Sequence, residues 1–124
     1  AKYYIKKGIL KEPCHFQFIL GAPGGMAGTI ENLVYLHSQL PANATWSASG
    51  LSKSHIPVML TALALGGNIR VGLEDNVYYS HGVLAESNRQ LVERAVRITQ
   101  AAGFEVATSA EARQILGLKG LERK

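Results

Sequence analysis

The alternation of apolar and polar positions predicts three β-strands in this chain. In the first of them, Phe16, Phe18 and Leu20 share one face, and His15 and Gln17 lie on the other. A strand with one apolar face packs on that side only, and its polar side chains must meet water, one another or a ligand. The predicted strands cover residues 15–21, 44–50 and 68–75.

Helical periodicity follows each predicted strand. After Thr29, a good N-cap residue, leucines recur at helical spacing up to Pro41. Ser54 is expected to cap a second helix, which Gly66 and Gly67 end. Two further helices are predicted to start at the capping boxes Ser87-x-x-Gln90 and Thr108-x-x-Glu111 and to stop at Gly103 and Gly117.

This order of strands and helices is typical of parallel α/β folds. Polar residues on one face of each strand favour the interior of a closed barrel over a doubly wound sheet, whose central strands are apolar on both faces. An eightfold barrel takes about 250 residues, so three strand–helix units cannot close one. We therefore expect residues 1–124 to form one partial domain, the C-terminal part of a TIM barrel with about three βα units and a terminal helix. The start at Ala1 instead of Met hints at processing or at a missing N-terminal part.

Composition narrows the class of protein. The chain has 124 residues, of which 47% are hydrophobic, as expected of one globular domain. Its net charge of +4 comes from scattered basic residues without a nucleic-acid-binding module, so we expect no nucleic-acid partner. Cys14 is the single cysteine and excludes an internal disulfide. No segment has the apolar length of a membrane span, and the absence of a signal-peptide pattern makes a cytoplasmic location the expectation.

The run from Asn68 to Tyr78 is the most informative stretch for function. It places Arg70 and Glu74 on the polar face of the third predicted strand and ends at Asp75, the only aspartate in the sequence. Charged groups at the C-terminal ends of parallel strands are where α/β proteins keep their chemistry. In an extended strand Arg70 and Glu74 would be about 13 Å apart and would not bridge each other. From its position alone, Asp75 could simply cap the turn that follows the strand.

Four segments carry a resemblance to a known family. They are Gln17-Phe-Ile-Leu-Gly-Ala-Pro-Gly-Gly25, Ala44-Thr-Trp-Ser47, Arg70-Val-Gly-Leu-Glu-Asp-Asn76 and Ala107-Thr-Ser-Ala-Glu-Ala112. With these motifs the chain resembles, over nearly its whole length, the beta-keto acid cleavage enzymes, the family typified by 3-keto-5-aminohexanoate cleavage enzyme. The resemblance implies a zinc-dependent TIM barrel, an acyltransferase that converts a beta-keto acid and acetyl-CoA into acetoacetate and a new CoA thioester.

The resemblance also implies roles for three residues. Glu74 would be a zinc ligand, and Arg70 and Asp75 would form a catalytic pair beside the reacting carbon. Zinc would act as a Lewis acid on the keto oxygen and stabilise an enolate. An arginine held by a carboxylate can orient the substrate and hold negative charge, and its high intrinsic pKa favours this electrostatic role over proton transfer.

The sequence departs from the family in its histidines. The family's two histidine ligands form a His-x-His pair on an early strand, whereas the histidines here, at 15, 37, 55 and 81, make no such pair. One carboxylate alone does not hold catalytic zinc, which takes three protein ligands. We therefore expect the chain to be inactive by itself and active only with an N-terminal part.

Two loops are candidates for binding the coenzyme. The glycine-rich loop with Gly24 and Gly25 precedes a helix and could receive a CoA phosphate on its amides, although a plain tight turn explains it as well. The loop from Gly50 to Ser54, with Lys53, is a second candidate, because barrel phosphate sites often use loops after late strands. His15 is expected to be structural and Trp46 to pack in the core.

Two rival functions stay open. The chain could be a non-catalytic half-barrel that serves in assembly or in anion binding, or it could belong to another zinc- or phosphate-dependent barrel enzyme. In each case the unpaired sheet edges favour a homo-oligomer.

Overall fold

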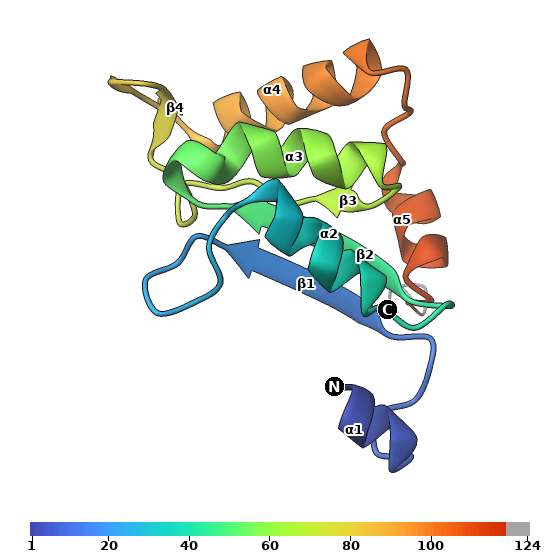
Figure 1. The fold of residues 1–124 in the computed structure, drawn as a ribbon. Coiled ribbons are helices and arrows are strands. Elements are labelled where there is room, and N and C mark those ends of the chain that lie inside the picture. The colour runs from blue at the N-terminus through green and yellow to red at the C-terminus, as the bar shows by residue number, and fades with distance from the viewer. Residues whose placement is uncertain (119–124) are drawn as a thin grey trace.

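The computed structural model describes residues 1–118, which form a parallel sheet covered by helices (Figure 1). The sheet contains β1 (His15–Leu20), β2 (Thr45–Gly50) and β3 (Asn68–Ile69), in the order β1-β2-β3. Gln17 is paired with Ser47, and Ser47 with Asn68. The expected parallel α/β arrangement is therefore confirmed for these units.

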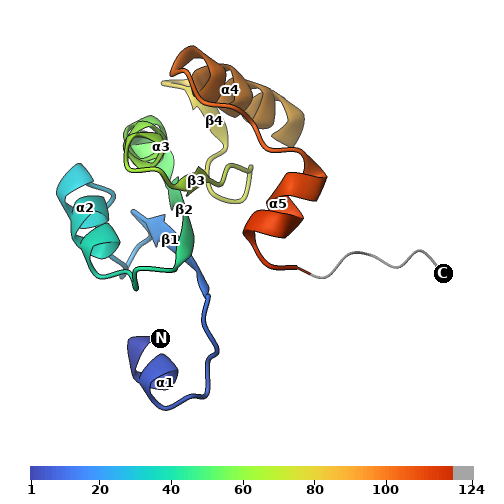
Figure 2. The same ribbon diagram turned by 90° about the vertical axis from the view of Figure 1, so that its right-hand side faces the viewer.

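Five α-helices accompany the sheet in the described part of the chain. Both α2 and α3 lie on one side of it, as Figure 2 shows in the view along the strands. The helices are α1 (Lys2–Lys6), α2 (Ile30–Ser38), α3 (His55–Ala64), α4 (Asn88–Ala101) and α5 (Ser109–Ile115), with a short 3-10 helix η1 (Ser52–Ser54) directly before α3.

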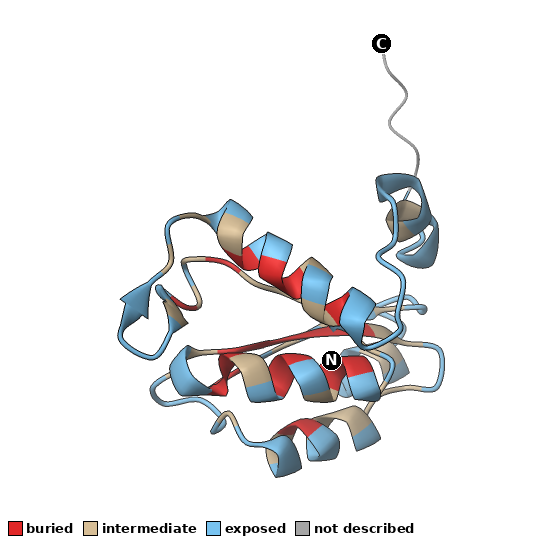
Figure 3. Ribbon diagram, turned by 90° about the horizontal axis from the view of Figure 1, so that it is seen from above, coloured by how far each residue is buried: buried red, intermediate tan, exposed pale blue. Residues whose placement is uncertain are grey.

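The core lies between the apolar face of the sheet and helices α2 and α3. Trp46 and Ala48 of β2 are buried against Leu33 of α2 and Val58 of α3. The buried residues form stripes along the sides of α3 and β2 that face each other (Figure 3). Trp46 is 5% exposed and packs against Phe18, so its predicted role in the core is confirmed.

The opposite face of the sheet is polar. It carries Gln17 of β1, Ser47 and Ser49 of β2 and Asn68 of β3, which the register brings side by side. His15 lies on the same face and contacts Ser47, with 3.1 Å between Nε2 and Oγ, as expected of a structural residue. The chemistry of the chain therefore has to be sought on this face and at the C-terminal ends of its strands.

Most of the predicted helix ends are confirmed. Thr29 caps α2 with its side chain, and Thr108 and Glu111 form a complete capping box at α5. At α4 the box is only half formed, because Ser87 accepts from Gln90 but the Gln90 side chain accepts from the amide of Glu86 instead. Ser54 precedes α3 without a side-chain capping bond, so its predicted capping role is wrong.

Two predictions along the chain need correction. The third strand was expected to run to Asp75, but β3 ends at Ile69 and a turn follows at residues 73–75. The segment expected to be a loop around Tyr78 forms an antiparallel hairpin of β4 (Tyr78–Ser80) and β5 (Val83–Leu84). Helix α1 was not predicted, since its five residues include no buried side chain and follow no amphipathic pattern.

Both outer strands of the sheet are open within residues 1–118, where β1 and β3 pair only with β2. Closure into a barrel would need further strands, so the TIM barrel stays a prediction. None of the helices described is long and apolar enough to cross a bilayer.

Candidate active site

The chain leaves the sheet through a tight turn directly after β3. The amide of Arg70 still donates to the Ala48 carbonyl at 3.0 Å, which continues the ladder by one bond. The carbonyl of Gly72 then accepts from the amides of Asp75 and Asn76. Helix α4 fixes the turn from outside, because the side chain of Asn88 accepts from the amide of Leu73 at 2.7 Å.

This turn gathers the three charged residues predicted from the sequence. The Nε of Arg70 lies 3.0 Å from Oδ2 of Asp75, which confirms the expected pair. A terminal nitrogen of the same guanidinium lies 3.1 Å from Oε1 of Glu74. The prediction that Arg70 and Glu74 stay about 13 Å apart is therefore wrong, because it assumed an extended strand where the chain turns.

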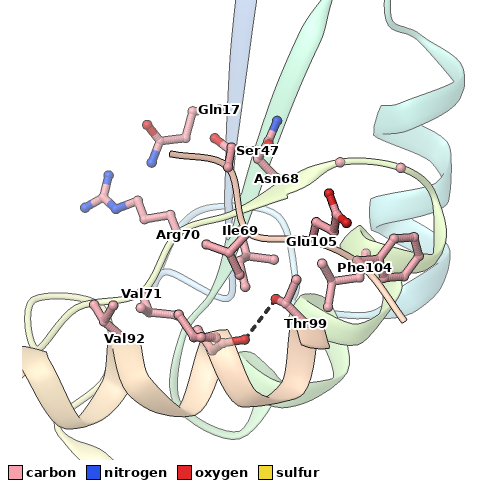
Figure 4. A pocket seen from close by; sticks show the side chains of 17 residues that line it. Gln17, Ser47, Asn68, Ile69, Arg70, Val71, Val92, Thr99, Phe104 and Glu105 are labelled. Atoms are coloured by element: carbon pink, nitrogen blue, oxygen red, sulfur yellow. Dashed lines mark hydrogen bonds between the residues drawn. The ribbon is translucent and has the colours of Figure 1, made fainter. Parts of the chain in front are cut away.

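Two further side chains from the polar face of the sheet complete the cluster. The hydroxyl of Ser49 donates to Oδ2 of Asp75 at 2.9 Å. The side-chain oxygen of Gln17, with the amide oriented to satisfy both groups, accepts from Arg70 at 2.7 Å. Figure 4 shows Gln17 and Arg70 on the same side of the sheet. Neither residue was predicted, although both lie on the strand faces recognised as polar.

Exposure differs sharply among the charged groups. The side chain of Asp75 is 9% exposed, that of Arg70 34% and that of Glu74 59%. The buried carboxylate of Asp75 is compensated by a guanidinium and a hydroxyl, as a buried charge requires. Glu74 is paired with Arg70 through Oε1 but remains largely exposed.

Gly72 makes room for the Glu74 carboxylate. A Cβ at this position would lie 2.2 Å from Oε2 of Glu74, which folds back over the glycine. The absence of a side chain at Gly72 therefore lets Glu74 approach Arg70 inside the turn.

The family comparison extends over the whole of this site. The family model described as beta-keto acid cleavage enzyme matches residues 1–118. The chain belongs to the beta-keto acid cleavage enzyme family.

Curated relatives agree with this assignment. The chain is 43% identical over 116 residues to 3-keto-5-aminohexanoate cleavage enzyme from Fusobacterium nucleatum, and this match covers 94% of the chain and 42% of the relative. It is 42% identical over 113 residues to the enzyme of the same name from Acetoanaerobium sticklandii, covering 91% and 41%. It is 34% identical over 118 residues to 3-dehydrocarnitine:acetyl-CoA trimethylamine transferase from Rhizobium meliloti, covering 95% and 39%. The chain thus spans about two fifths of the length of the curated relatives it matches.

The resemblance to the family implies a zinc ion, and Glu74 is the ligand that the sequence predicts for it. The exposed carboxylate of Glu74 has the donor chemistry that zinc accepts. Residues 1–118 contain no group of three His, Cys, Asp or Glu side chains able to hold a metal ion.

The residues predicted to bind the coenzyme lie at the C-terminal end of the sheet. Gly24 and Gly25 are in the loop after β1, Gly50 is the last residue of β2, and Lys53 is in η1. The amide of Gly25 donates to the Ala22 carbonyl at 3.0 Å, so the expected free amide is not found at this residue. Gly50 is buried, and a Cβ there would lie 2.3 Å from the carbonyl oxygen of Ser54. Close packing against the start of α3 thus explains this glycine without a ligand. Coenzyme binding by Gly24, Gly25, Gly50 and Lys53 stays a prediction.

A second polar cluster lies beside the turn and was missed from the sequence. The Nδ1 of His55 lies 2.8 Å from the side-chain nitrogen of Asn76 and 3.1 Å from a terminal nitrogen of Arg94. Burial and the neighbouring Arg94 charge lower the pKa of His55, and Asp75 opposes this weakly. The one available signal was Asn76, which directly follows the predicted aspartate.

Proposed function

We propose that the chain forms the C-terminal part of a (β/α)8 barrel that cleaves a beta-keto acid with acetyl-CoA, giving acetoacetate and a new CoA thioester. The observation that carries this proposal is the pairing of Arg70 with Asp75 and Glu74 at the carboxyl end of β3, in a chain of this family. That end of the strands is where parallel α/β barrels hold their active sites.

The open edge of β3 supports the barrel. A groove of about 690 Å³ runs between this edge and α4 and includes Ile69, Val71, Val92 and Phe104 among its lining residues (Figure 4). In a parallel barrel the next strand pairs at this edge and covers apolar side chains of this kind. The polar face with Gln17 and Ser49 would then line the barrel interior.

The cluster suits a reaction that builds up negative charge. The guanidinium of Arg70 is held by three acceptors, on Gln17, Glu74 and Asp75. Its unpaired N–H groups therefore have a fixed orientation. A fixed guanidinium orients a carboxylate or a developing oxyanion and needs no reorganisation during the reaction. In Asp75, Oδ2 holds both Ser49 and the Nε of Arg70, whereas Oδ1 lies 3.4 Å from the guanidinium. Oδ1 is therefore the oxygen we assign to accept the proton from the substrate carbon next to the keto group.

Zinc belongs to the proposal with Glu74 as its ligand from this chain. A zinc ion held there would supply Lewis-acid chemistry at the keto oxygen. The remaining ligands would come from residues outside 1–118, which is why activity is proposed only for a protein that also carries an N-terminal part. A homo-oligomer and a cytoplasmic location complete the proposal.

Acetoacetate release tests this function. The native protein is supplied with acetyl-CoA and a panel of beta-keto acids, and both acetoacetate and the new thioester are measured. We expect both products in equal amounts, and we expect residues 1–124 alone to form neither. Consumption of keto acid without acetoacetate would assign the chain to another reaction. Absence of a preceding segment in the native gene would favour the non-catalytic half-barrel.

A further inference from the structure

A cavity of about 560 Å³ opens beside the active-site turn, between the start of α3, the β4–β5 hairpin and α4. Its lining includes Lys53, His55, His81 and Arg94, and no Asp or Glu is among its lining residues in the described chain. The cavity therefore collects positive charge and imidazole groups without a carboxylate to balance them.

Arg94 is the most unusual group in this cavity. It is 9% exposed, and within residues 1–118 it forms no salt bridge with a carboxylate. Its guanidinium lies over the ring of Tyr79, 4.3 Å from the centroid, and donates to the Tyr79 carbonyl. Burial lowers its pKa, which is the effect of a charge that these neutral contacts compensate only partly. A buried charge of this kind calls for an anion.

The protonation of His55 can be assigned from its partners. The amide nitrogen of Asn76 donates to the Tyr78 carbonyl, which fixes the orientation of that amide. This nitrogen and a terminal nitrogen of Arg94 both face Nδ1 of His55. Because an arginine can only donate, Nδ1 must accept, and the proton of the neutral ring sits on Nε2.

Two buried donors are consequently left without an acceptor in the described chain. They are Nε2 of His55 and Nε of Arg94. An unpaired buried donor is costly, and both residues that carry these donors line the cavity, which indicates a ligand that brings acceptor oxygens.

The position of the cavity agrees with a phosphate ligand. In (β/α)8 barrels, phosphate groups are frequently bound by the loops after the last two strands together with the N-terminus of a short extra helix. Here the loop after β2 contains η1 and leads into α3, whose positive end lies at His55, and the segment after β3 supplies Asn76.

We propose that this cavity binds a phosphoryl group, which accepts from His55 Nε2 and Arg94 Nε and is balanced in charge by Lys53 and Arg94. The identification of this group as a phosphate of acetyl-CoA rests on the function proposed above. Asn76 joins the two sites, since it directly follows Asp75 and contacts His55. A coenzyme anchored here would have its phosphates beside the turn that holds the reacting groups.

Kinetics with a truncated co-substrate test the link to the coenzyme. In the native protein, Lys53→Gln should raise the KM for acetyl-CoA about fivefold and Arg94→Gln about tenfold or more, with kcat changed by less than about twofold. Acetyl-pantetheine, which lacks the phosphates, should show the same KM in all variants. The matched control is Arg89→Gln, which removes one charge from the same helix at an exposed side chain paired with Glu93. An equal rise of KM for both thioesters, or none for either, would overturn the proposal.

Direct binding separates the site from the reaction. Calorimetry with adenosine 3′,5′-bisphosphate and with inorganic phosphate should show binding that Lys53→Gln weakens and Arg89→Gln does not. Arg94 is buried and its replacement can unfold the protein, so the binding measurement uses Lys53→Gln, which changes an exposed side chain of η1. If Lys53→Gln weakens binding in a protein that does not turn over acetyl-CoA, the proposed function is refuted and the phosphoryl site is supported. Turnover with no dependence on Lys53 in either measurement would refute the site and leave the function standing. If Lys53→Gln weakens the binding of inorganic phosphate but not of adenosine 3′,5′-bisphosphate, the phosphoryl site is supported and its assignment to the coenzyme is overturned.

Discussion

Arg70 and Asp75 are joined across a turn by a bond of 3.0 Å between Nε and Oδ2, and Ser49 donates to the same carboxylate oxygen at 2.9 Å. This arrangement holds the aspartate from two sides, one charged and one neutral. The side chain of Asp75 is 9% exposed, so few water molecules can replace a lost partner. Removal of either partner should therefore affect the site more than a surface bond would.

Ser49→Ala should slow catalysis by releasing one side of Asp75. A hydrogen bond to a buried charge contributes about 1.5–3 kcal/mol, so we expect kcat to fall by about tenfold or more while the KM values change little. Steady-state kinetics of the native protein measures this. Ser47→Ala is the matched control, because Ser47 lies on the same strand face but contacts His15. Equal effects of the two substitutions would show that Ser49 has no special role.

Glu74→Gln should reduce bound zinc and abolish turnover in the native protein. The amide keeps an oxygen for Arg70 but loses the charge that favours a dication. Metal content after dialysis, measured together with acetoacetate release, checks both parts. Glu86→Gln removes an exposed carboxylate outside the cluster and should change neither. Stoichiometric zinc and normal turnover in Glu74→Gln would exclude Glu74 from the site.

Alanine substitution should lower turnover at Gly72 and the free energy of unfolding at Gly50. At Gly72 the three atoms nearest to the new Cβ all belong to the Glu74 carboxylate, which can swing away. The free energy of unfolding should therefore change by about 0.5 kcal/mol or less, while turnover falls. At Gly50 the Cβ would lie 2.3 Å from the Ser54 carbonyl oxygen and 2.8 Å from Cβ of Val58. The backbone must move there, and we expect a loss on the order of 1–3 kcal/mol. Urea titrations and kinetics of both variants decide; a stable Gly50→Ala protein would contradict the close packing described here.

The parts of the fold predicted correctly depend on neighbours in sequence. Alternation in residues 15–20 and the capping residues Thr29 and Thr108 act within a few positions, so the pattern alone identifies them. The pairing of Arg70 with Asp75 was also predicted, but from the resemblance to the family and not from a local pattern.

The errors arise where distant residues decide. The turn after β3 is closed by local bonds to the Gly72 carbonyl, but it is also held by Asn88, 15 residues after the Leu73 amide from which its side chain accepts. Ser49 reaches Asp75 over 26 residues and could be found only with the strand register in hand. The contact between His55 and Arg94 spans 39 residues and joins two helices whose relative position the sequence does not reveal.

The buried His55 predicts a loss of stability in mild acid. Burial and Arg94 lower its pKa from the ordinary value of 6.5, while Asp75 acts weakly in the other direction. The unfolded chain therefore binds this proton more readily than the folded one. The contribution of His55 to the free energy of unfolding is complete above pH 6.5. It is lost as the pH falls from there towards the lowered pKa of the folded state. A proton added to the folded protein would place a charge on His55 facing Arg94 and, across the cavity, Lys53 and His81. Urea titrations at about pH 7.5 and about pH 5.5 measure the loss. The loss should be smaller in His55→Gln than in the unsubstituted protein. It should be unchanged or nearly so in the control His15→Gln, whose exposed imidazole lies outside this cavity. Identical losses in all three proteins would assign the acid sensitivity to other groups.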